Sequence, residues 1–190
     1  MSYRELLPSM LSGQPRIFQL AIDGRARKYT IINIVVTGIA FGMSNLIGVL
    51  ATDPGALPMS GTYGLIVPLL FSLYGITTII GVLAGFCLVY WAAARAFGGP
   101  GGFGLIIDLI GMSAVPFWVL APLLNYTLRF RTSESVKLTL LVPLIVVFIW
   151  SFKLIRQSLV SGQGLSEAKA TLALGCIWIF SISAVYVFLP

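Results

Sequence analysis

Hydrophobic residues fill five long runs of this chain, and short segments rich in charge, proline and glycine separate the runs. No charged residue occurs from Tyr29 to Thr52 or from Pro54 to Ala94. A helix needs about 20 mainly apolar residues to cross a bilayer, and its backbone groups must be satisfied within the helix. The pattern therefore predicts an all-α, polytopic membrane protein. The five expected transmembrane helices cover residues 29–50, 64–91, 103–124, 137–155 and 170–189.

The first 28 residues have a different pattern, which predicts two short amphipathic helices at the membrane interface. Apolar residues from Tyr3 to Leu11 recur at the spacing of one helix face. Pro15 suits the first turn of a second helix. Basic residues of this segment would face anionic headgroups, namely Arg16, Arg25, Arg27 and Lys28. A disordered tail is the alternative. We therefore expect an interfacial segment at residues 1–28 and a five-helix transmembrane domain at residues 29–190.

The positions of the basic residues predict the orientation of the chain in the membrane. With a cytoplasmic N-terminus, nine of the twelve Lys and Arg residues flank the inner ends of the spans. The three others are Arg129, Arg131 and Lys137. Because cytoplasmic segments carry an excess of Lys and Arg, this distribution favours an inner N-terminus and an outer C-terminus.

Composition excludes several classes of function. Only 9% of the residues are charged, compared with about 25% in soluble proteins. The net charge is +6, but the basic residues flank spans and form no single stripe, so no nucleic-acid partner is expected. The chain has no histidine, which excludes a Ser-His-Asp triad and histidine-ligated metals. We predict no catalytic, cofactor-binding or metal-binding residue and no enzymatic activity.

Three polar residues within or beside the spans are candidate functional residues. Asp108 is the only acidic residue inside a predicted span, and an intramembrane carboxylate is a functional candidate. It lies near the cytoplasmic start of that span, so pairing with a nearby arginine such as Arg95 is the alternative. Asn45 is expected to donate an interhelical hydrogen bond, and Lys153 to reach the interface. Together, Asp108, Asn45 and Lys153 could line a transport path, although the chain lacks an inverted repeat with broken helices.

Two glycine pairs have the spacing that allows helices to approach closely in lipid. Gly38 and Gly42 lie in the first predicted span, and Gly81 and Gly85 in the second. Packing within the chain and contact with a partner protein are both compatible with this spacing. We therefore expect membrane lipids and other integral membrane proteins as partners. The glycine-rich segment at residues 98–104 lacks the Gly-Lys-Ser/Thr ending of a phosphate loop and predicts a tight turn.

The second half of the chain also carries a series of short motifs. In order, they are Gly98-Gly99, Gly101-Gly102-Phe103, Gly111-Met112-Ser113-Ala114-Val115-Pro116, Trp150, Ser161-Gly162-Gln163-Gly164-Leu165-Ser166 and Ala168-Lys169-Ala170. In their order and spacing, these motifs resemble the YIP membrane family (Rab-interacting-protein domain) in its compact bacterial form. Within that resemblance, the matching positions are Gly98, Gly99, Gly111, Pro116, Trp150, Gly164 and Lys169.

The resemblance implies five spans with an inner N-terminus, in a bacterial inner (cytoplasmic) or internal membrane. Eukaryotic members act in endoplasmic reticulum and Golgi trafficking with small GTPases. This chain departs from them because it lacks a long N-terminal region and an Asp-Leu-x-Gly-Pro motif, and because Met112 replaces an aromatic residue. These departures argue against a small GTPase partner. We expect a non-enzymatic accessory or assembly subunit of a membrane complex, or a membrane organiser; a small transporter or permeation protein is the alternative.

Overall fold

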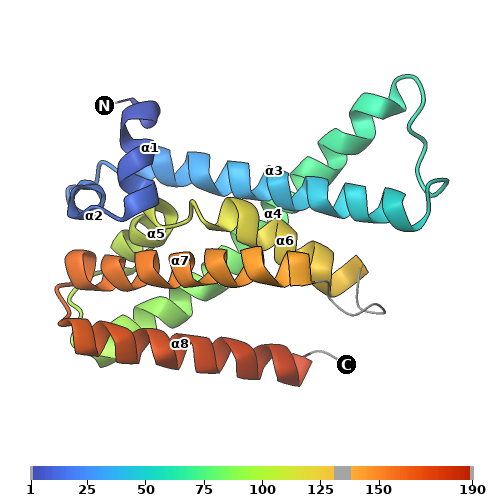
Figure 1. The fold of residues 1–190 in the computed structure, drawn as a ribbon. Helices are drawn as coiled ribbons and strands as arrows, with labels where there is room; N and C mark the ends of the chain where they lie inside the picture. Colours follow the sequence, from blue (N-terminus) through green and yellow to red (C-terminus); the bar gives the residue numbers. More distant parts are fainter. Residues whose placement is uncertain (1, 131–137, 189–190) are drawn as a thin grey trace. The chain divides into compact units, whose positions relative to one another are not determined.

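The computed structural model describes the backbone of residues 2–130 and 138–188, and every regular element in these residues is a helix (Figure 1). The prediction of an all-α fold is thus confirmed for the described chain. The helices are α1 (Tyr3–Ser12), α2 (Pro15–Ile22), α3 (Arg27–Thr52), α4 (Tyr63–Ala96), α5 (Phe103–Met112), α6 (Phe117–Phe130), α7 (Leu138–Gln163) and α8 (Glu167–Phe188).

Three described helices are long and apolar enough to cross a bilayer: α3, α4 and the part of α7 from Leu141 to Gln163. The pair of α5 and α6 adds a fourth if it counts as one bent span. The described residues thus support three or four spans, not the predicted five. The fifth predicted span, residues 170–189, falls on α8. The structure describes the side chains of α8 only for residues 167–179, which are too few to cross a bilayer.

The third predicted span is broken rather than straight. Helices α5 and α6 meet at an angle of 82° across Ser113–Pro116. Pro116 has no backbone N–H, and its ring disfavours a helical conformation of the preceding residue. The N–H of Ser113 closes α5 on the carbonyls of Leu109 and Ile110, at 3.1 and 3.0 Å. A continuous helix over residues 103–124 is therefore replaced by two helices and a sharp turn.

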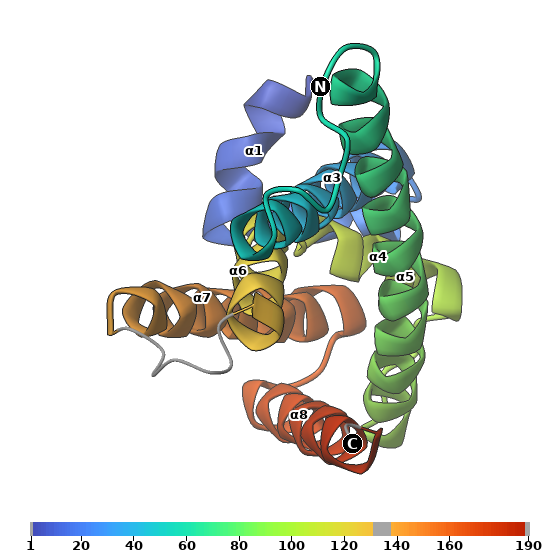
Figure 2. The same cartoon turned by 90° about the vertical axis from the view of Figure 1, so that its right-hand side faces the viewer.

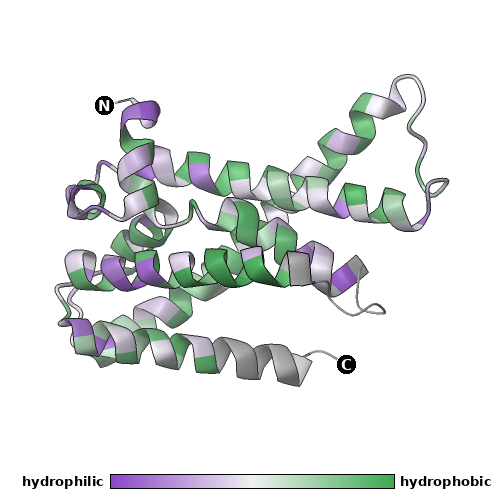
Figure 3. Cartoon of the chain, viewed as in Figure 1, coloured by the Kyte–Doolittle hydropathy of each residue, from purple (hydrophilic) through white to green (hydrophobic). Residues whose placement is uncertain are grey.

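Two of the spanning helices extend beyond their predicted bounds. Helix α4 continues to Ala96 instead of ending near residue 91, and α7 continues to Gln163 instead of ending near residue 155. Figure 2 shows α4 as one uninterrupted helix. The predictions followed hydrophobicity, whereas a helix continues into polar sequence as long as its backbone bonds are maintained. Hydrophilic residues accordingly occupy the ends of several helices, including the start of α8 (Figure 3).

The chain divides into two compact units. Unit 1 comprises residues 1–30, 83–113 and 152–190, and unit 2 comprises residues 31–82 and 114–151. Unit 1 thus contains α1, α2, α5, α8 and the C-terminal parts of α4 and α7. Unit 2 contains most of α3, the first part of α4, α6 and the first part of α7.

Helices α1 and α2 occupy the predicted amphipathic segment, but their apolar sides pack inside unit 1. Leu6, Met10, Ile17 and Phe18 are completely buried, and α2 contacts both α1 and α5. Burial also raises the pKa of the Tyr3 hydroxyl from its ordinary value of 10.0 to about 12. The apolar stripe that predicted contact with a bilayer therefore serves mainly as a protein core.

Candidate functional site

The carboxylate of Asp108 is buried in unit 1 beside an arginine. Its Oδ1 lies 3.0 Å from Nε of Arg27, and its side chain is 6% exposed. Arg27 also donates from Nη2 to the carbonyl of Gly104 at 3.4 Å. A buried charge is costly unless it is paired, so Arg27 provides the compensation that Asp108 requires. The sequence predicted an arginine partner but named Arg95; the partner is Arg27, at the first turn of α3.

Asn45 belongs to unit 2, where it links α3 to α6. Its Oδ1 accepts a hydrogen bond from Nη1 of Arg129 at 3.0 Å, and its Nδ2 donates to the Phe41 carbonyl at 3.1 Å. One turn away on α6, Nδ2 of Asn125 donates to Oγ of Ser44 at 3.1 Å. Asn45 thus accepts the interhelical bond that it was expected to donate. Arg131 and Lys137, which the charge count placed with Arg129, lie outside the described residues.

The three candidate polar residues have separate surroundings. Asp108 is buried in unit 1, Asn45 is buried in unit 2, and Lys153 is exposed on α7. Each of the two buried groups is paired with an arginine of its own unit. Arg129 donates a hydrogen bond to Asn45, whereas Arg27 compensates Asp108 by charge, because Oδ1 of Asp108 accepts no hydrogen bond among the described residues.

The two glycine pairs differ in what they contact. In unit 2, a Cβ added at Gly38 would lie 2.5 Å from Cα of Ile76, and one at Gly42 would meet the Phe71 carbonyl. Gly75 on α4 faces Gly42 from the other side, and a Cβ there would lie 2.7 Å from the Gly42 Cα. Helices α3 and α4 therefore touch backbone to backbone at these glycines, and no sequence motif indicated the role of Gly75.

Gly81 and Gly85 have open surroundings. A Cβ added at either residue would meet no atom within 4 Å. Both residues are exposed, together with Ala84 and Leu88 on the same side of α4. The same sequence spacing thus marks a tight contact on α3 and an uncovered surface on α4.

The family-motif glycines of unit 1 form a compact joint between two turns. Gly98 has a φ of +95°, which only glycine adopts readily. The N–H of Gly101 donates to Oε1 of Gln163 at 3.0 Å, and a Cβ at Gly99 would lie 2.9 Å from the same oxygen. Gln163 was not among the predicted candidate residues; it is 2% exposed at the end of α7. Its hydrogen bond joins the turn between α4 and α5 to the turn between α7 and α8.

Helix α5 is held closely on two sides by further motif glycines. A Cβ at Gly111 would lie 2.8 Å from Cβ of Thr30, and one at Gly162 would lie 2.7 Å from Cδ1 of Leu109. Gly164, with a φ of +65°, turns the chain towards α8. Of the other motif residues, Pro116 is buried in the break between α5 and α6, and Trp150 is half-buried on α7.

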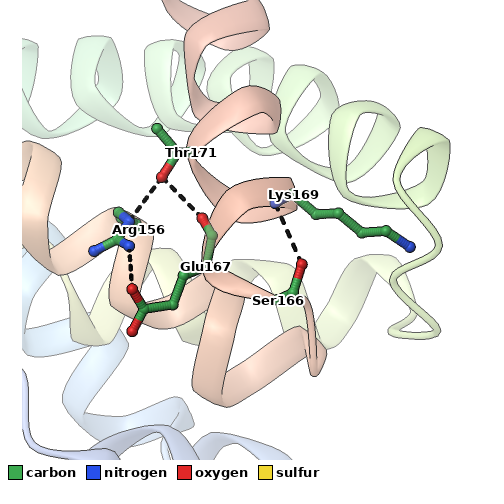
Figure 4. A network of polar contacts seen from close by, with 5 residues as sticks. All are labelled: Arg156, Ser166, Glu167, Lys169 and Thr171. Atoms are coloured by element: carbon green, nitrogen blue, oxygen red, sulfur yellow. Dashed lines mark hydrogen bonds and ion pairs between the residues drawn. The ribbon is translucent and has the colours of Figure 1, made fainter.

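A polar network fixes the start of α8 to α7. Nη2 of Arg156 lies 2.8 Å from Oε2 of Glu167, and its Nε donates to Oγ1 of Thr171 at 2.9 Å (Figure 4). The N–H of Lys169 donates to Oγ of Ser166 at 3.4 Å, as expected of a residue that caps a helix. The side chain of Lys169 points away from this network (Figure 4). Lys169 itself is exposed.

A buried hydrogen bond between α4 and α7 was not predicted. The hydroxyl of Tyr90, completely buried, shares a hydrogen bond with Oγ of Ser158. Both residues belong to unit 1; Tyr90 lies in the second predicted span, whereas Ser158 lies beyond residue 155, the predicted end of the fourth. A single Tyr and a single Ser in two apolar helices carry no signal of pairing, because a serine in a helix usually bonds a carbonyl of its own helix, as Ser158 also does with Ile155.

Comparison with known proteins identifies one family. Comparisons with curated proteins and with solved structures gave no match. A family model, the Yip1 domain, matches residues 16–189, which include nearly all of α2 and all the motif residues described above. This match also covers most of the first half of the chain, outside the motifs on which the resemblance was based. Since the match covers nearly the whole chain and at least three helices can span a bilayer, the protein is an integral membrane protein that belongs to the Yip1 domain family.

Proposed function

We propose that the protein is a non-enzymatic accessory or assembly subunit, which acts by binding other integral membrane proteins. The uncovered surface of α4 carries this proposal. In the most apolar 18-residue stretch of α4, only 11% is buried within the chain, compared with 39% for the same length of α3. Large apolar side chains are exposed along its length, including Leu65, Leu69, Leu73, Ile80, Val82 and Leu88.

The open glycine pair supports contact with a protein in addition to lipid. In a membrane, helices associate through close packing, and small residues allow their backbones to approach. Gly38 and Gly42 make such a contact within the chain, against Phe71 and Ile76. Gly81 and Gly85 offer the same spacing without an occupant among the described residues. A helix of another subunit would complete this contact.

The proposal is tested by the double substitution Gly81→Leu and Gly85→Leu. Crosslinking in intact membranes and purification in a mild detergent would identify the neighbours of the native protein. We expect the double variant to fold and to lose these neighbours. Gly175→Leu is the control, because a Cβ at Gly175 on α8 also meets no atom within 4 Å and this residue lies outside the α4 surface. A native protein without neighbours in both measurements, or a variant that keeps them, would contradict the proposal.

We also propose that the protein lies in a bacterial inner or internal membrane with its N-terminus in the cytoplasm. In this proposal, the bent pair of α5 and α6 crosses the membrane. The Gly101–Gln163 hydrogen bond supports this crossing. It brings the turn before α5 and the turn after α7 together, so both turns lie on one side of the bilayer. Because α7 crosses once, the chain between α4 and α7 must also cross.

The basic residues support the same orientation. All nine that the charge count assigned to the cytoplasm belong to unit 1, whereas Arg129, Arg131 and Lys137 fall in the sequence range of unit 2. Cysteines at Thr62 and Ser166, in a Cys176→Ala background, test the topology with a membrane-impermeant reagent. We expect Thr62 to be labelled from outside and Ser166 from inside. Labelling of both from one side would exclude this topology. The outer C-terminus depends on α8 and stays a prediction.

The transporter alternative has no comparable support. It required Asp108, Asn45 and Lys153 to line one path. However, Asp108 is paired with Arg27 inside unit 1, and Asn45 is paired with Arg129 inside unit 2. A purified, reconstituted protein that moved a solute, with loss of flux in Asp108→Asn, would restore this alternative.

A further inference from the structure

The corner between α2 and α3 contains a polar cavity that the contacts described above do not use. Its volume is about 310 Å³. It is lined by Arg16, Gln19, Leu20, Asp23, Arg25, Lys28 and Tyr29, all in unit 1. We call this set the corner pocket. A water molecule occupies roughly 30 Å³ in the liquid, so the pocket has room for a phosphate group and a few attached carbon atoms.

The charges of the corner pocket favour an anion. Arg16, Arg25 and Lys28 contribute three positive charges, and Asp23 contributes one negative charge. The Asp23 Oδ1 accepts a hydrogen bond from Nε2 of Gln19 at 3.0 Å. Lys28 lies with its Nζ 4.8 Å from the centre of the Tyr29 ring. Arg25 and Lys28 are both exposed, so their charged ends can reach a bound group.

The remaining lining and the place of the pocket in the chain favour a lipid over a free ion. Leu20 is half-buried and Tyr29 is buried, so one wall of the pocket is apolar. The lining ends at Tyr29, in the first turn of α3, where the uncharged run of this span begins. Residues at the end of a span lie at the level of the headgroups, where Lys and Arg attract anionic lipids.

We infer that the corner pocket binds the phosphate of an anionic phospholipid headgroup. Arg25 and Lys28 contact the phosphate oxygens, Gln19 is positioned to bond a headgroup hydroxyl, and Leu20 and Tyr29 face the glycerol and the start of the acyl chains. Arg27, the neighbouring basic residue, is committed to Asp108 and takes no part. This site is a separate property from subunit binding by α4 and does not depend on it.

The test uses the full chain, purified in a mild uncharged detergent. Binding of dioctanoyl phosphatidylglycerol is compared with that of dioctanoyl phosphatidylcholine and inorganic phosphate by isothermal titration calorimetry. We expect tight binding of phosphatidylglycerol alone, weakened by added salt. In the double variant Arg25→Gln with Lys28→Gln, the affinity should fall by about thirtyfold, as expected for the loss of two basic residues near a headgroup. The matched control is Lys153→Gln with Lys169→Gln, which removes the same charge from exposed positions outside the pocket.

Each of the other results would overturn the inference. Phosphatidylcholine has the same phosphate, but its choline group cancels the net charge. Equal binding of this lipid would show that the pocket does not select a headgroup with a net negative charge. Equal binding of inorganic phosphate would assign the pocket to a soluble ion. A comparable loss in the control variant would mean that net charge alone attracts the lipid. If the double variant does not fold, Lys28→Gln alone should still weaken binding by about fivefold; unchanged affinity would overturn the inference. Because no partner protein is present, the outcome is independent of the subunit proposal.

Discussion

The two compact units differ in where their large apolar side chains lie, although both consist of helices in the described residues. Among the described residues, the largest completely buried side chains all belong to unit 1; they include Phe18, Tyr90, Met112 and Leu159. Most of the large exposed apolar side chains belong to unit 2, for example Leu65, Val142 and Val146. Unit 1 therefore resembles a soluble protein core, while unit 2 relies on surfaces that a bilayer can solvate.

The difference shows that hydrophobicity has two roles in this chain. In unit 1, apolar side chains from short amphipathic helices and from spanning helices fill a shared interior. In unit 2, close backbone contacts at Gly38, Gly42 and Gly75 join the helices and need few buried large side chains. In lipid, packing replaces hydrophobic burial as the source of helix association.

The largest effect is expected from emptying the core of unit 1. Phe18→Ala removes a completely buried ring from α2. We expect a loss of about 4 kcal/mol in the free energy of unfolding, because lost transfer energy and the resulting cavity add. Leu65→Ala in unit 2, where the side chain is 80% exposed, should change stability by less than about 0.5 kcal/mol. Denaturant unfolding in micelles measures both; similar losses would remove the contrast between the units.

The second prediction reverses the test by adding volume to unit 2. Gly38→Leu places a side chain against the backbone of α4 at Ile76. A backbone cannot move aside by a change of rotamer, as a side chain can. We expect a loss of about 3 kcal/mol, at the upper end for overpacking. The matched variant Gly81→Leu has the same chemistry at an open site and should be close to native in stability. If both variants unfold at the same denaturant concentration, the close contact is not essential.

The third prediction concerns the ion pair of unit 1. Arg27→Gln leaves the buried Asp108 carboxylate without its partner and should cost about 3 kcal/mol. Asp108→Asn leaves only a half-exposed arginine behind and should cost less, about 1 kcal/mol. The double variant should be more stable than Arg27→Gln alone, which thermal unfolding can measure. A double variant as unstable as the sum of both single changes would show that the pair is not coupled.

The smallest effect is expected at the polar link of unit 2. Arg129→Gln removes the donor to Oδ1 of Asn45, and Asn45 keeps its bond to the Phe41 carbonyl. We expect a loss of about 1 kcal/mol, typical of one hydrogen bond. Arg4→Gln, at an exposed position of α1, is the control for loss of one positive charge. A loss at Arg129 as large as that at Phe18 would mean that polar contacts dominate unit 2.

The features that follow from local composition could be predicted. Helical structure, at least three of the spans, the two N-terminal helices and the family all rest on residues near one another in sequence. Proline did not give a reliable signal of helix ends. Pro8, Pro68, Pro122 and Pro143 each lie within the first two turns of a helix, whereas Pro116 separates two helices. A proline early in a helix loses few bonds, and hydrophobicity alone does not reveal where a helix begins.

Span length, hydrophobicity and motif order are properties of the linear chain, so the amino-acid sequence was enough to identify an all-α membrane protein of the Yip1 domain family. Tertiary structure alone decided that Asp108 pairs with Arg27 and that Gln163 joins two turns. It also decided that one glycine pair is covered and the other open. These outcomes depend on which distant residues meet. Identical local patterns are compatible with several such meetings, and only the packing of the helices selects among them.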